Sequence, residues 1–470
     1  MVMMPKTKIV CTIGPASETQ DIIRGLAVSG MNVARLNFSH GTHSEHLEKI
    51  RMIRAVSAEL EKPVAILQDL GGPKIRVGVI PEPGVRLTPG QTFILTGEPV
   101  EGTLERVSVS YADLSREVRP GDPILMADGM MELSVLDTKG PDVVCKVITG
   151  GVLTSHKGIN LPSSTISVDA MTPKDYEDLL FGLENDVDFV ALSFVRRAED
   201  ILHLKRIISE NRKSVPVIAK IEKHEALNNI EAIMAAADGI MVARGDLGVE
   251  IALERVPAIQ KMLVKMANKV GKPVIIATQM LRSMVDSPRP TRAEAADVAN
   301  AVLDGADAVM LSEETASGGF PVESVKFMVR IAENAEQSFD HERYLKMMPE
   351  KNISESVAYA SCILADHLNA AVIAATTRSG FTAANISRFK PRSRILALSP
   401  DSRTVRRLAL YWGCIPSLVP ETRDTDEKIE QTAQTVWNTG LVGKGDLAVI
   451  TAGHPVWAQG TTNMLRVKQF

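Results

Sequence analysis

Eight short apolar segments, each followed by polar or charged residues, constrain the fold of this chain more than any other feature. They are residues 7–13, 32–36, 64–67, 189–192, 215–221, 239–243, 274–277 and 308–311, and segments with helical spacing separate most of them. Continuous apolar character is typical of buried parallel strands. Eight strands alternating with helices predict an α/β protein built on a (β/α)₈ TIM barrel, whose active site lies at the carboxyl ends of the strands.

Polar residues follow these segments in pairs two positions apart, and such pairs point to the same side of an extended chain. The pairs are Arg35 with Asn37, Lys220 with Glu222, and Arg244 with Asp246, while Asp69, Thr278 and Ser312 stand singly at three other strand ends. Ion pairs also cap barrel strands for structural reasons, but three pairs at one end of a barrel favour a functional site.

Composition narrows the class of protein. The chain has 470 residues, 45% of them hydrophobic, and a formal net charge of -4, which leaves room for two domains beside a barrel of roughly 250 residues. This balance gives no support for a nucleic-acid partner. We find neither a signal peptide nor the roughly 18 apolar residues that span a membrane, so we expect a cytoplasmic protein without a membrane partner. The four cysteines lack metal-site or Cys-x-x-Cys spacing and are expected to be reduced core residues.

Helix-start signals support the helices between the strands. Ser17 with Gln20 predicts one capped helix start, and Thr291 with Glu294 predicts another.

Two regions differ from the barrel pattern. Between the third and fourth segments, short strands and frequent turns predict a small β domain, which leaves the catalytic end of the barrel and is placed to close over a substrate. A passive insertion is the structural alternative. From about residue 343 an αβ pattern with its own core begins.

The first strand of this last region runs into a turn of hydroxyls and glycine before a helix start, which suits a bound phosphate. The predicted effector-phosphate residues are Thr376, Thr377, Ser379, Gly380 and Thr382. A basic run follows, at Arg392, Arg394, Arg403, Arg406 and Arg407. It either adds charge to a regulatory site or forms a solvated face.

The charged residues at the strand ends suggest a chemistry. Glu222 and Asp246 offer the oxygen ligands that Mg²⁺ or Mn²⁺ requires. Lys220, in an apolar segment, is costly to bury without an anion beside it, and its ammonium would stabilise a negative charge that develops during reaction. Arg35, Arg76 and Lys157 are available for phosphate oxygens, whereas Arg244 is either a site residue or a structural ion-pair partner. These residues predict metal-assisted chemistry on a small phosphorylated anion.

Many sequence segments in series resemble one family. They are TKIVCTIGPAS near the start, MNVARLNFSHG at 31–41, GGPKIR at 71–76, KGINLP at 157–162, AKIEKHEAL at 219–227, MVARGDLGVEI at 241–251, ATQML at 277–281, the long segment at 288–318 and GTTN at 460–463. Together they closely resemble the pyruvate kinase family, over nearly the whole chain and in domain order.

The resemblance implies three domains and a reaction. It implies a TIM-barrel catalytic domain at 1–71 and 170–342, an inserted small β-barrel lid domain at 72–169 and a C-terminal αβ regulatory domain at 343–470. The reaction is transfer of the phosphoryl group of phosphoenolpyruvate to ADP, which gives ATP and the enolate of pyruvate, and it is the last step of glycolysis. The resemblance also implies a homotetramer and an allosteric effector that carries a phosphate, either a sugar phosphate or a nucleotide monophosphate.

The resemblance also implies roles for individual residues. Lys220 would stabilise the transferring phosphoryl group and the enolate, and Glu222 and Asp246 would hold the divalent ion. Substrate contacts would come from Arg35, Lys220, Gly245, Asp246 and Thr278, and nucleotide contacts from Asn37, His40, Arg76 and Lys157. The proton donor to the enolate is open among Thr278, Ser312 and an ordered water.

One position departs from the family pattern. The familiar third strand end reads Asp-Thr-Lys-Gly-Pro-Glu, whereas this chain has Lys74 at the acidic position. Members with the acidic residue typically require K⁺, bound by groups that match Asn37, Ser39, Asp69 and the Leu70 carbonyl. The Lys74 ammonium would supply a positive charge and repel a bound cation, so we predict activity largely independent of K⁺.

Two other functions compete with this prediction. A metal-dependent lyase or aldolase acting through a pyruvate enolate would explain Glu222 and Asp246 but leaves the lid residues Arg76 and Lys157 without a role. A non-catalytic sensor on a barrel scaffold would leave Lys220 and its neighbours unexplained.

Overall fold

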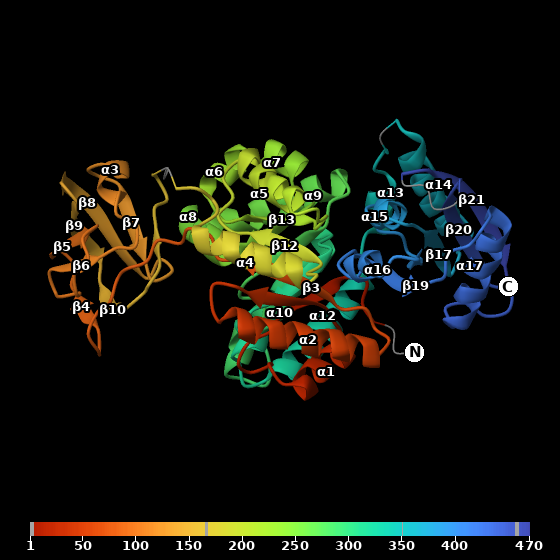
Figure 1. The fold of residues 1–470 in the computed structure, drawn as a ribbon, viewed down its shortest axis with the longest axis horizontal. Coiled ribbons are helices and arrows are strands. Elements are labelled where there is room, and N and C mark those ends of the chain that lie inside the picture. Colours follow the sequence, from red (N-terminus) through yellow and green to blue (C-terminus); the bar gives the residue numbers. More distant parts are fainter. Residues whose placement is uncertain (1–3, 165–167, 350, 456–459) are drawn as a thin grey trace.

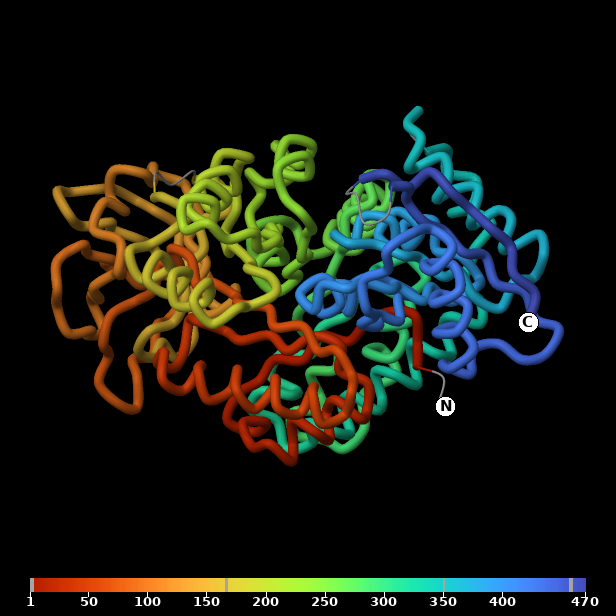
Figure 2. Tube along the Cα trace, turned by 45° about the vertical axis from the view of Figure 1, so that its right-hand side comes forward, coloured from red at the N-terminus to blue at the C-terminus, as the bar shows by residue number. Residues whose placement is uncertain are grey.

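The computed structural model describes residues 4–164, 168–349, 351–455 and 460–470. Three domains follow one another in space, with a β domain on one side of a central barrel and an αβ domain on the other (Figure 1). The turned view in Figure 2 keeps this order. Within the described ranges, no helix is long and apolar enough to cross a membrane.

The central domain is a closed barrel of eight parallel strands, which confirms the predicted TIM barrel. In hydrogen-bonded order the strands are β1 (Lys8–Thr12), β16 (Ala308–Leu311), β15 (Val274–Ala277), β14 (Gly239–Ala243), β13 (Val217–Ile221), β12 (Phe189–Leu192), β3 (Ala65–Leu70) and β2 (Met31–Asn37). Seven of the eight strands are buried along their whole length. Apolar side chains therefore fill the barrel, and polar chemistry is confined to its ends.

Helices surround the barrel. They are α1 (Gln20–Ser29), α2 (His43–Glu59), α4 (Pro173–Glu184), α5 (Ala198–Glu210), α6 (His224–Asn228), α7 (Ile230–Ala236), α8 (Arg244–Glu250), α9 (Val256–Lys269), α10 (Arg292–Asp304), α11 (Glu313–Ala316) and α12 (Pro321–Glu336), with 3₁₀ turns at Leu253–Arg255 and Arg282–Val285. The predicted capping box of Thr291 and Glu294 is present on α10. The prediction for Ser17 is wrong, because Thr19 caps α1 and the Ser17 hydroxyl turns back to accept from the Gly14 N–H.

The β domain lies between β3 and α4. It contains α3 (Leu114–Glu117) and the strands β4 (Val85–Leu87), β5 (Thr92–Thr96), β6 (Arg106–Ser108), β7 (Pro123–Met126), β8 (Met131–Lys139), β9 (Asp142–Thr149), β10 (Gly151–Leu153) and β11 (Ile159–Asn160). Its main sheet has the order β11-β7-β8-β9-β5-β6. Arg76 and Val77 bridge to Gly158 at one edge and Val109 at the other, so this segment connects the two edges of the sheet as in a small barrel.

The C-terminal domain is a five-stranded sheet covered by helices, in the strand order β19-β18-β17-β20-β21. Its strands are β17 (Val372–Thr376), β18 (Arg394–Ser399), β19 (Cys414–Leu418), β20 (Leu447–Gly453) and β21 (Thr462–Gln469), and its helices include α13 (His341–Leu345), α14 (Ile353–His367), α15 (Phe381–Ser387), α16 (Ser402–Leu408) and α17 (Thr425–Asn438). Only β20 and β21 pair in antiparallel fashion in this sheet as described. The four cysteines are buried and are not joined in disulfides.

Four alternate barrel strands begin with a side-chain oxygen that accepts the first backbone N–H of a neighbouring strand. The acceptors are Asn32 for Ile9, Asp188 for Ile66, Asp238 for Val217 and Asp307 for Val274, at 2.7–3.0 Å. Because each bond joins the start of one strand to a fixed residue of the next, the repeat fixes the stagger of the barrel.

The C-terminal domain docks on this end of the barrel through buried charges. Lys390 donates to Asp307 at 2.6 Å, with both side chains almost fully buried, and Arg406 of α16 donates to Asp188 at 2.7 Å. The C-terminal domain and the barrel are therefore joined at the strand starts, opposite the end that carries the predicted site.

Candidate functional site

The Lys220 ammonium lies at the centre of a charged network at the carboxyl ends of the strands. It is the penultimate residue of β13, and its Nζ is 3.0 Å from Glu222 Oε1 and 3.3 Å from Asp69 Oδ1. It also donates a hydrogen bond of 2.6 Å to Ser193 Oγ. The Lys220 side chain is 11% exposed, and the Asp69 and Glu222 side chains are 1% exposed. The buried ammonium is therefore paired with two carboxylates, which offset the cost of burying its charge.

Burial and the charges of neighbouring groups shift the pKa values of Asp69, Lys220 and Glu222. Burial alone would raise the pKa of Asp69, but the ammonium of Lys220 and the guanidinium of Arg35 hold it below its ordinary value. Burial would lower the pKa of Lys220, but Asp69 and Glu222 raise it. Burial raises the pKa of Glu222, and Asp246 raises it further against the opposing charge of Lys220. Lys220 and Asp69 are therefore both charged near neutral pH.

Arg35 contacts the other carboxylate oxygen of Asp69. Its Nε donates to Asp69 Oδ2 at 2.6 Å, and its Nη1 donates to Thr12 Oγ1 at 3.0 Å. Strand pairing explains the contact, because Asn37 on β2 lies beside Asp69 on β3 and Arg35 lies two residues earlier. One guanidinium and one ammonium thus face a single carboxylate at the mouth of the barrel.

Asp246 lies on the first turn of α8 and is paired with Lys74. The Lys74 Nζ lies 2.9 Å from Asp246 Oδ1. The third strand end therefore brings a second ammonium to the carboxylates, as the sequence led us to expect. Its ion-pair partner is Asp246 rather than the groups that match the K⁺ ligands.

The expected alignment of Arg244 with Asp246 is wrong. The chain leaves β14 directly into α8 at Arg244, so the two residues are not on extended backbone. Arg244 donates to Asp297 at 2.7 Å and to the Thr278 carbonyl at 2.9 Å. It is the structural ion-pair partner that the sequence left as one of two alternatives.

Gly245 and Thr278 are joined by a hydrogen bond. The Gly245 N–H donates to Thr278 Oγ1 at 2.8 Å, and that hydroxyl donates to the Ala277 carbonyl at 2.7 Å. Thr278 has φ +68° and the following residue, Gln279, has φ +54°. A β-branched residue in this region costs of order 1–3 kcal/mol and is most often found where a site must be held in a special shape.

Ser312 directly follows β16 and lies beside a buried glutamate. Its backbone N–H donates to Glu314 Oε2 at 2.7 Å, and the same carboxylate accepts the Leu281 N–H at 2.9 Å. Among the described residues, no partner hydrogen-bonds the buried Ser312 hydroxyl. The structure leaves the choice of proton donor among Thr278, Ser312 and water as the sequence had it.

The residues expected at the nucleotide come from the β domain and from the barrel. Arg76 donates to the His156 carbonyl at 3.0 Å, and Lys157 is exposed on the next segment of the lid. Burial and then the charges of Arg76 and Arg35 lower the pKa of His40. The Asn37 amide oxygen accepts the Ser39 N–H at 3.2 Å.

The donor set fits a divalent cation. Glu222 and Asp246 are carboxylates near enough that Asp246 raises the pKa of Glu222, and a cation held between them would relieve that repulsion. The groups that match the K⁺ ligands are bonded within the protein: Ser193 Oγ donates to the Leu70 carbonyl at 2.7 Å, and Asp69 is held by Arg35 and Lys220.

The predicted effector residues lie around one small pocket of about 20 Å³ in the C-terminal domain. The lining residues include Thr376, Thr377, Ser379 and Thr382, together with residues 460–462. The Gly380 N–H at the start of α15 donates to Thr377 Oγ1. Lys428 of α17 also lines the pocket, and burial lowers the pKa of its ammonium to about 8.

Sequence reasoning missed Ser193, Phe194 and Lys428. The Phe194 N–H donates to Glu222 Oε2 at 2.8 Å. Ser193 directly follows the fourth apolar segment, so the search for polar residues at strand ends would have found it. Phe194 contributes only its backbone N–H, which a search for polar side chains does not detect. Lys428 reaches its pocket from a helix far along the chain, and no local pattern places it there.

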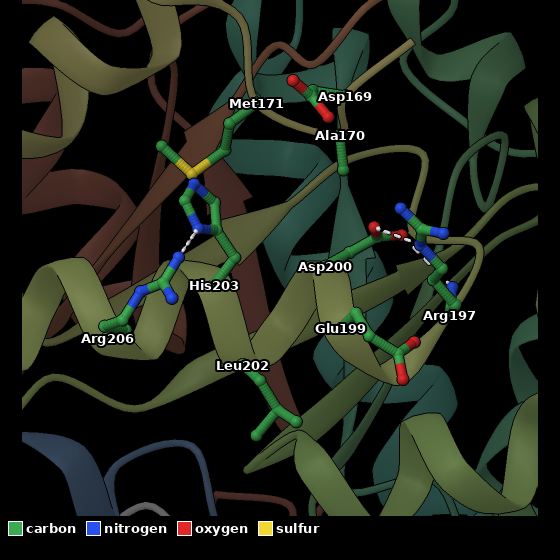
Figure 3. A pocket seen from close by; sticks show the side chains of 9 residues that line it. All are labelled: Asp169, Ala170, Met171, Arg197, Glu199, Asp200, Leu202, His203 and Arg206. Carbon is green, nitrogen blue, oxygen red and sulfur yellow. Dashed lines mark hydrogen bonds and ion pairs between the residues drawn. The ribbon is translucent and has the colours of Figure 1, made fainter. Parts of the chain in front are cut away.

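A pocket of about 540 Å³ lies away from this site, along α5 (Figure 3). Asp169, Ala170 and Met171, where the chain returns from the lid, form one side of it, and His203 and Arg206 of α5 line the other. Arg206 Nη2 and His203 Nδ1 lie 2.7 Å apart and Arg197 is paired with Asp200. Arg197 and Asp200 thus form an ion pair within the pocket lining.

The fold and the site define an α/β-barrel enzyme with paired charges at the carboxyl ends of its strands. The chain matches the family model for the pyruvate kinase barrel domain over residues 4–325 and the model for the pyruvate kinase alpha/beta domain over residues 355–468. These matches cover most of the chain, and full-length relatives agree with them. The chain therefore belongs to the pyruvate kinase family.

Similar proteins include three bacterial pyruvate kinases. That of Clostridium acetobutylicum is 44% identical over 470 residues, which cover 99% of both chains. Pyruvate kinase 2 of a Synechocystis species is 49% identical over 467 residues, which cover 98% of this chain and 79% of that protein. That of Staphylococcus haemolyticus is 46% identical over 471 residues, which cover 99% and 80%. The activity of the chain is phosphoryl transfer from phosphoenolpyruvate to ADP, and the lyase and sensor alternatives are set aside.

Proposed function

We propose that this kinase reaction takes place around Lys220, with Arg35 and Thr278 as further catalytic residues. The observation that carries the proposal is the buried ammonium of Lys220, which is shared by Asp69, Glu222 and Ser193. A phosphorylated anion entering the cluster would compete for this ammonium and for the Arg35 guanidinium. Both would neutralise charge on the transferring phosphoryl group, where positioning and electrostatics supply most of the catalysis.

The enolate is the second charge that the site must hold. When the phosphoryl group leaves the enol oxygen for the ADP β-phosphate, negative charge develops on that oxygen, and Lys220 stabilises it. The Gly245 and Asp246 backbone and the Thr278 hydroxyl, which is fixed by the bonds at 2.7 and 2.8 Å, orient the substrate. A proton then reaches the methylene carbon from Thr278, Ser312 or water and gives pyruvate.

Glu222 and Asp246 would hold the divalent cation that pyruvate kinases need, which we take to be Mg²⁺ or Mn²⁺. When bound, it would supply positive charge for the phosphate and carboxylate oxygens of the substrate. Lys74 Nζ lies 2.9 Å from Asp246 Oδ1, and this ion pair would have to loosen when the cation binds Asp246.

On the nucleotide side, Arg76 and Lys157 would bind phosphates, with Asn37 and His40 beside them, and the lid would close over ADP. Domain orientation that does not respond to Mg²⁺ and nucleotide in solution scattering would count against closure.

We further propose that K⁺ is not required. Two features support this. Lys74 places a fixed positive charge among the carboxylates, and the Leu70 carbonyl and Asp69 are already satisfied by Ser193, Arg35 and Lys220. A monovalent cation would therefore meet repulsion and few free ligands.

One assay tests the residues and the cation together. Pyruvate formation from phosphoenolpyruvate, ADP and Mg²⁺ is measured with K⁺ and with tetramethylammonium at equal ionic strength, for the wild type and for Lys74→Glu. We expect similar kcat in both salts for the wild type and activation by K⁺ in the variant. Strong K⁺ activation of the wild type would reject the role of Lys74 but keep the kinase.

The remaining assignments concern regulation and assembly. We propose that the pocket of Thr376, Thr377, Ser379, Gly380 and Thr382 binds the phosphate of a sugar phosphate or nucleotide monophosphate, supported by the lining ammonium of Lys428. Lys428→Met should abolish activation by such a compound and leave basal kcat intact; full activation in the variant would exclude this pocket.

The enzyme is further proposed to be a cytoplasmic homotetramer with domains at 1–71 and 170–342, 72–169 and 343–470. Light scattering that shows only monomers would contradict the tetramer.

A further inference from the structure

Ser193 occupies a position at the end of β12 that the proposed reaction does not yet use. Its side chain is almost fully buried, with 2% of the residue exposed. Its Oγ lies 2.6 Å from Lys220 Nζ and 2.7 Å from the Leu70 carbonyl oxygen. Ser193 therefore connects the ammonium to the end of β3, the strand that carries Asp69.

The direction of these two hydrogen bonds follows from the chemistry of the partners. An ammonium only donates and a carbonyl only accepts, whereas a hydroxyl has one proton to give. Ser193 must therefore accept from Lys220 and donate its own proton to Leu70. The Leu70 carbonyl fixes the hydroxyl rotor, so a lone pair of Ser193 stays aimed at the ammonium.

Ser193 also differs in charge from the other two acceptors of Lys220. Glu222 is a proposed cation ligand and Asp69 is shared with Arg35, so the pull of both carboxylates on the ammonium changes as charged ligands arrive. A neutral hydroxyl does not compete with an incoming phosphoryl group for positive charge. It leaves the charge of Lys220 available while restricting where the ammonium lies.

The backbone around Ser193 is held in an unusual shape. The next residue, Phe194, has φ +55°, and this turn aims its N–H at Glu222 Oε2. Gly72 packs against the turn so closely that a Cβ at Gly72 would lie 2.9 Å from the Phe194 ring and 3.1 Å from Ser193 Cβ. Strain of this kind is retained where a site depends on the geometry.

We propose that Ser193 is a positioning residue, which holds the Lys220 ammonium at the place where the phosphoryl group and the enolate meet it. The inference rests on the proposed role of Lys220. It predicts that, without the hydroxyl, the ammonium moves toward the carboxylates and away from the substrate. The loss would therefore reduce stabilisation of the transition state more than binding of the substrate.

The test compares Ser193→Ala, Ser193→Thr and Ser324→Ala with the wild type, by steady-state pyruvate formation at saturating ADP and Mg²⁺. Ser324, a buried serine of α12, donates to the Phe320 carbonyl at 2.8 Å and serves as the matched control. For Ser193→Ala we expect kcat to fall about tenfold to a hundredfold, with the KM for phosphoenolpyruvate within about twofold. Ser193→Thr, which keeps a hydroxyl, should recover most of the lost kcat, and Ser324→Ala should keep wild-type kcat.

Other outcomes separate this inference from the role of Lys220. An unchanged kcat in Ser193→Ala, or a rise in KM alone, would overturn the positioning role. If Ser193→Thr folds but is no more active than Ser193→Ala, the hydroxyl is not the cause and the inference also fails. Thermal unfolding confirms folding for each variant, and if threonine prevents it, the split between kcat and KM in Ser193→Ala decides. A Lys220→Met variant with near-normal kcat would instead remove the proposed function of Lys220.

Discussion

Replacing Lys220 by methionine tests the site most directly, because it removes the ammonium and keeps the length of the side chain. Lys220 Nζ approaches its carboxylate partners at 3.0 and 3.3 Å, and an anionic oxygen of the substrate would take a similar distance. At about 3 to 4 Å and an effective dielectric constant near 20, one such charge pair is worth about 4 to 5 kcal/mol. Since 1.36 kcal/mol is tenfold in rate, we expect kcat to fall by about 10³- to 10⁴-fold.

The same substitution affects folding less than the loss of a buried partner usually does. Asp69 keeps the Arg35 guanidinium, and Glu222 keeps the Phe194 N–H and has a pKa that burial already raises, so it is able to take up a proton. We expect a lower melting temperature but a folded protein at 25 °C.

The assay is steady-state pyruvate formation with Mg²⁺, with the folded fraction measured by near-UV circular dichroism. Lys205→Met is the matched control, because Lys205 pairs with Asp238 at 2.7 Å at the opposite end of the barrel. A kcat for Lys220→Met within tenfold of the wild type, at an equal folded fraction, would refute the electrostatic argument.

Three further predictions concern stability. Lys390→Met should lower the free energy of unfolding by about 3 kcal/mol in urea titrations, because it leaves the nearly buried Asp307 without its cation. Gly305→Ala should lower the melting temperature strongly, since the new Cβ would lie 1.8 Å from the Tyr344 hydroxyl oxygen at φ +96°. Burial lowers the pKa of His341 from 6.5 to about 4, so the unfolded state binds more protons between these values and the native state loses stability as pH falls through this window. His341→Gln should make unfolding less sensitive to pH there.

Each of these three has a control and a contradicting result. Lys346→Met breaks an exposed ion pair with Glu342 and should change the free energy of unfolding by less than about 0.5 kcal/mol. An equal loss of stability in Lys346→Met and Lys390→Met would show that burial of the Lys390–Asp307 pair does not add to its contribution. Gly440 has φ +67°, but a Cβ added there would meet nothing within 4 Å, so Gly440→Ala is the control. Equal melting temperatures for Gly305→Ala and Gly440→Ala would show that backbone strain, and not the clash with Tyr344, dominates. A wild type and a His341→Gln variant with parallel stability curves from pH 7 to 4.5 would exclude the histidine as the cause.

Local pattern was sufficient for the barrel and for part of the site. Most of the apolar segments ended within a residue of the strand ends, although β3 runs on to Leu70 and includes Asp69. Lys220, Asp69 and Arg35 were therefore expected together, and they share one network. The same pattern failed at Arg244, because it assumed that the extended chain continues after β14, whereas α8 begins at that residue. It failed at Ser17 because two hydroxyls precede α1, and Thr19 makes the cap.

The sequence by itself determined the eight strands, the inserted β domain and the kinds of group at the strand ends, because burial on both faces of a parallel strand leaves a continuous apolar segment. Only the tertiary structure decided which of these groups meet. Strand stagger sets Ser193 against Lys220 and Leu70, and the path of the third strand end brings Lys74 to Asp246. Packing of a distant helix brings Lys428 to the pocket that Thr382 also lines. These contacts join residues far apart in the chain, and their distances depend on how whole strands and helices pack, which no local spacing encodes.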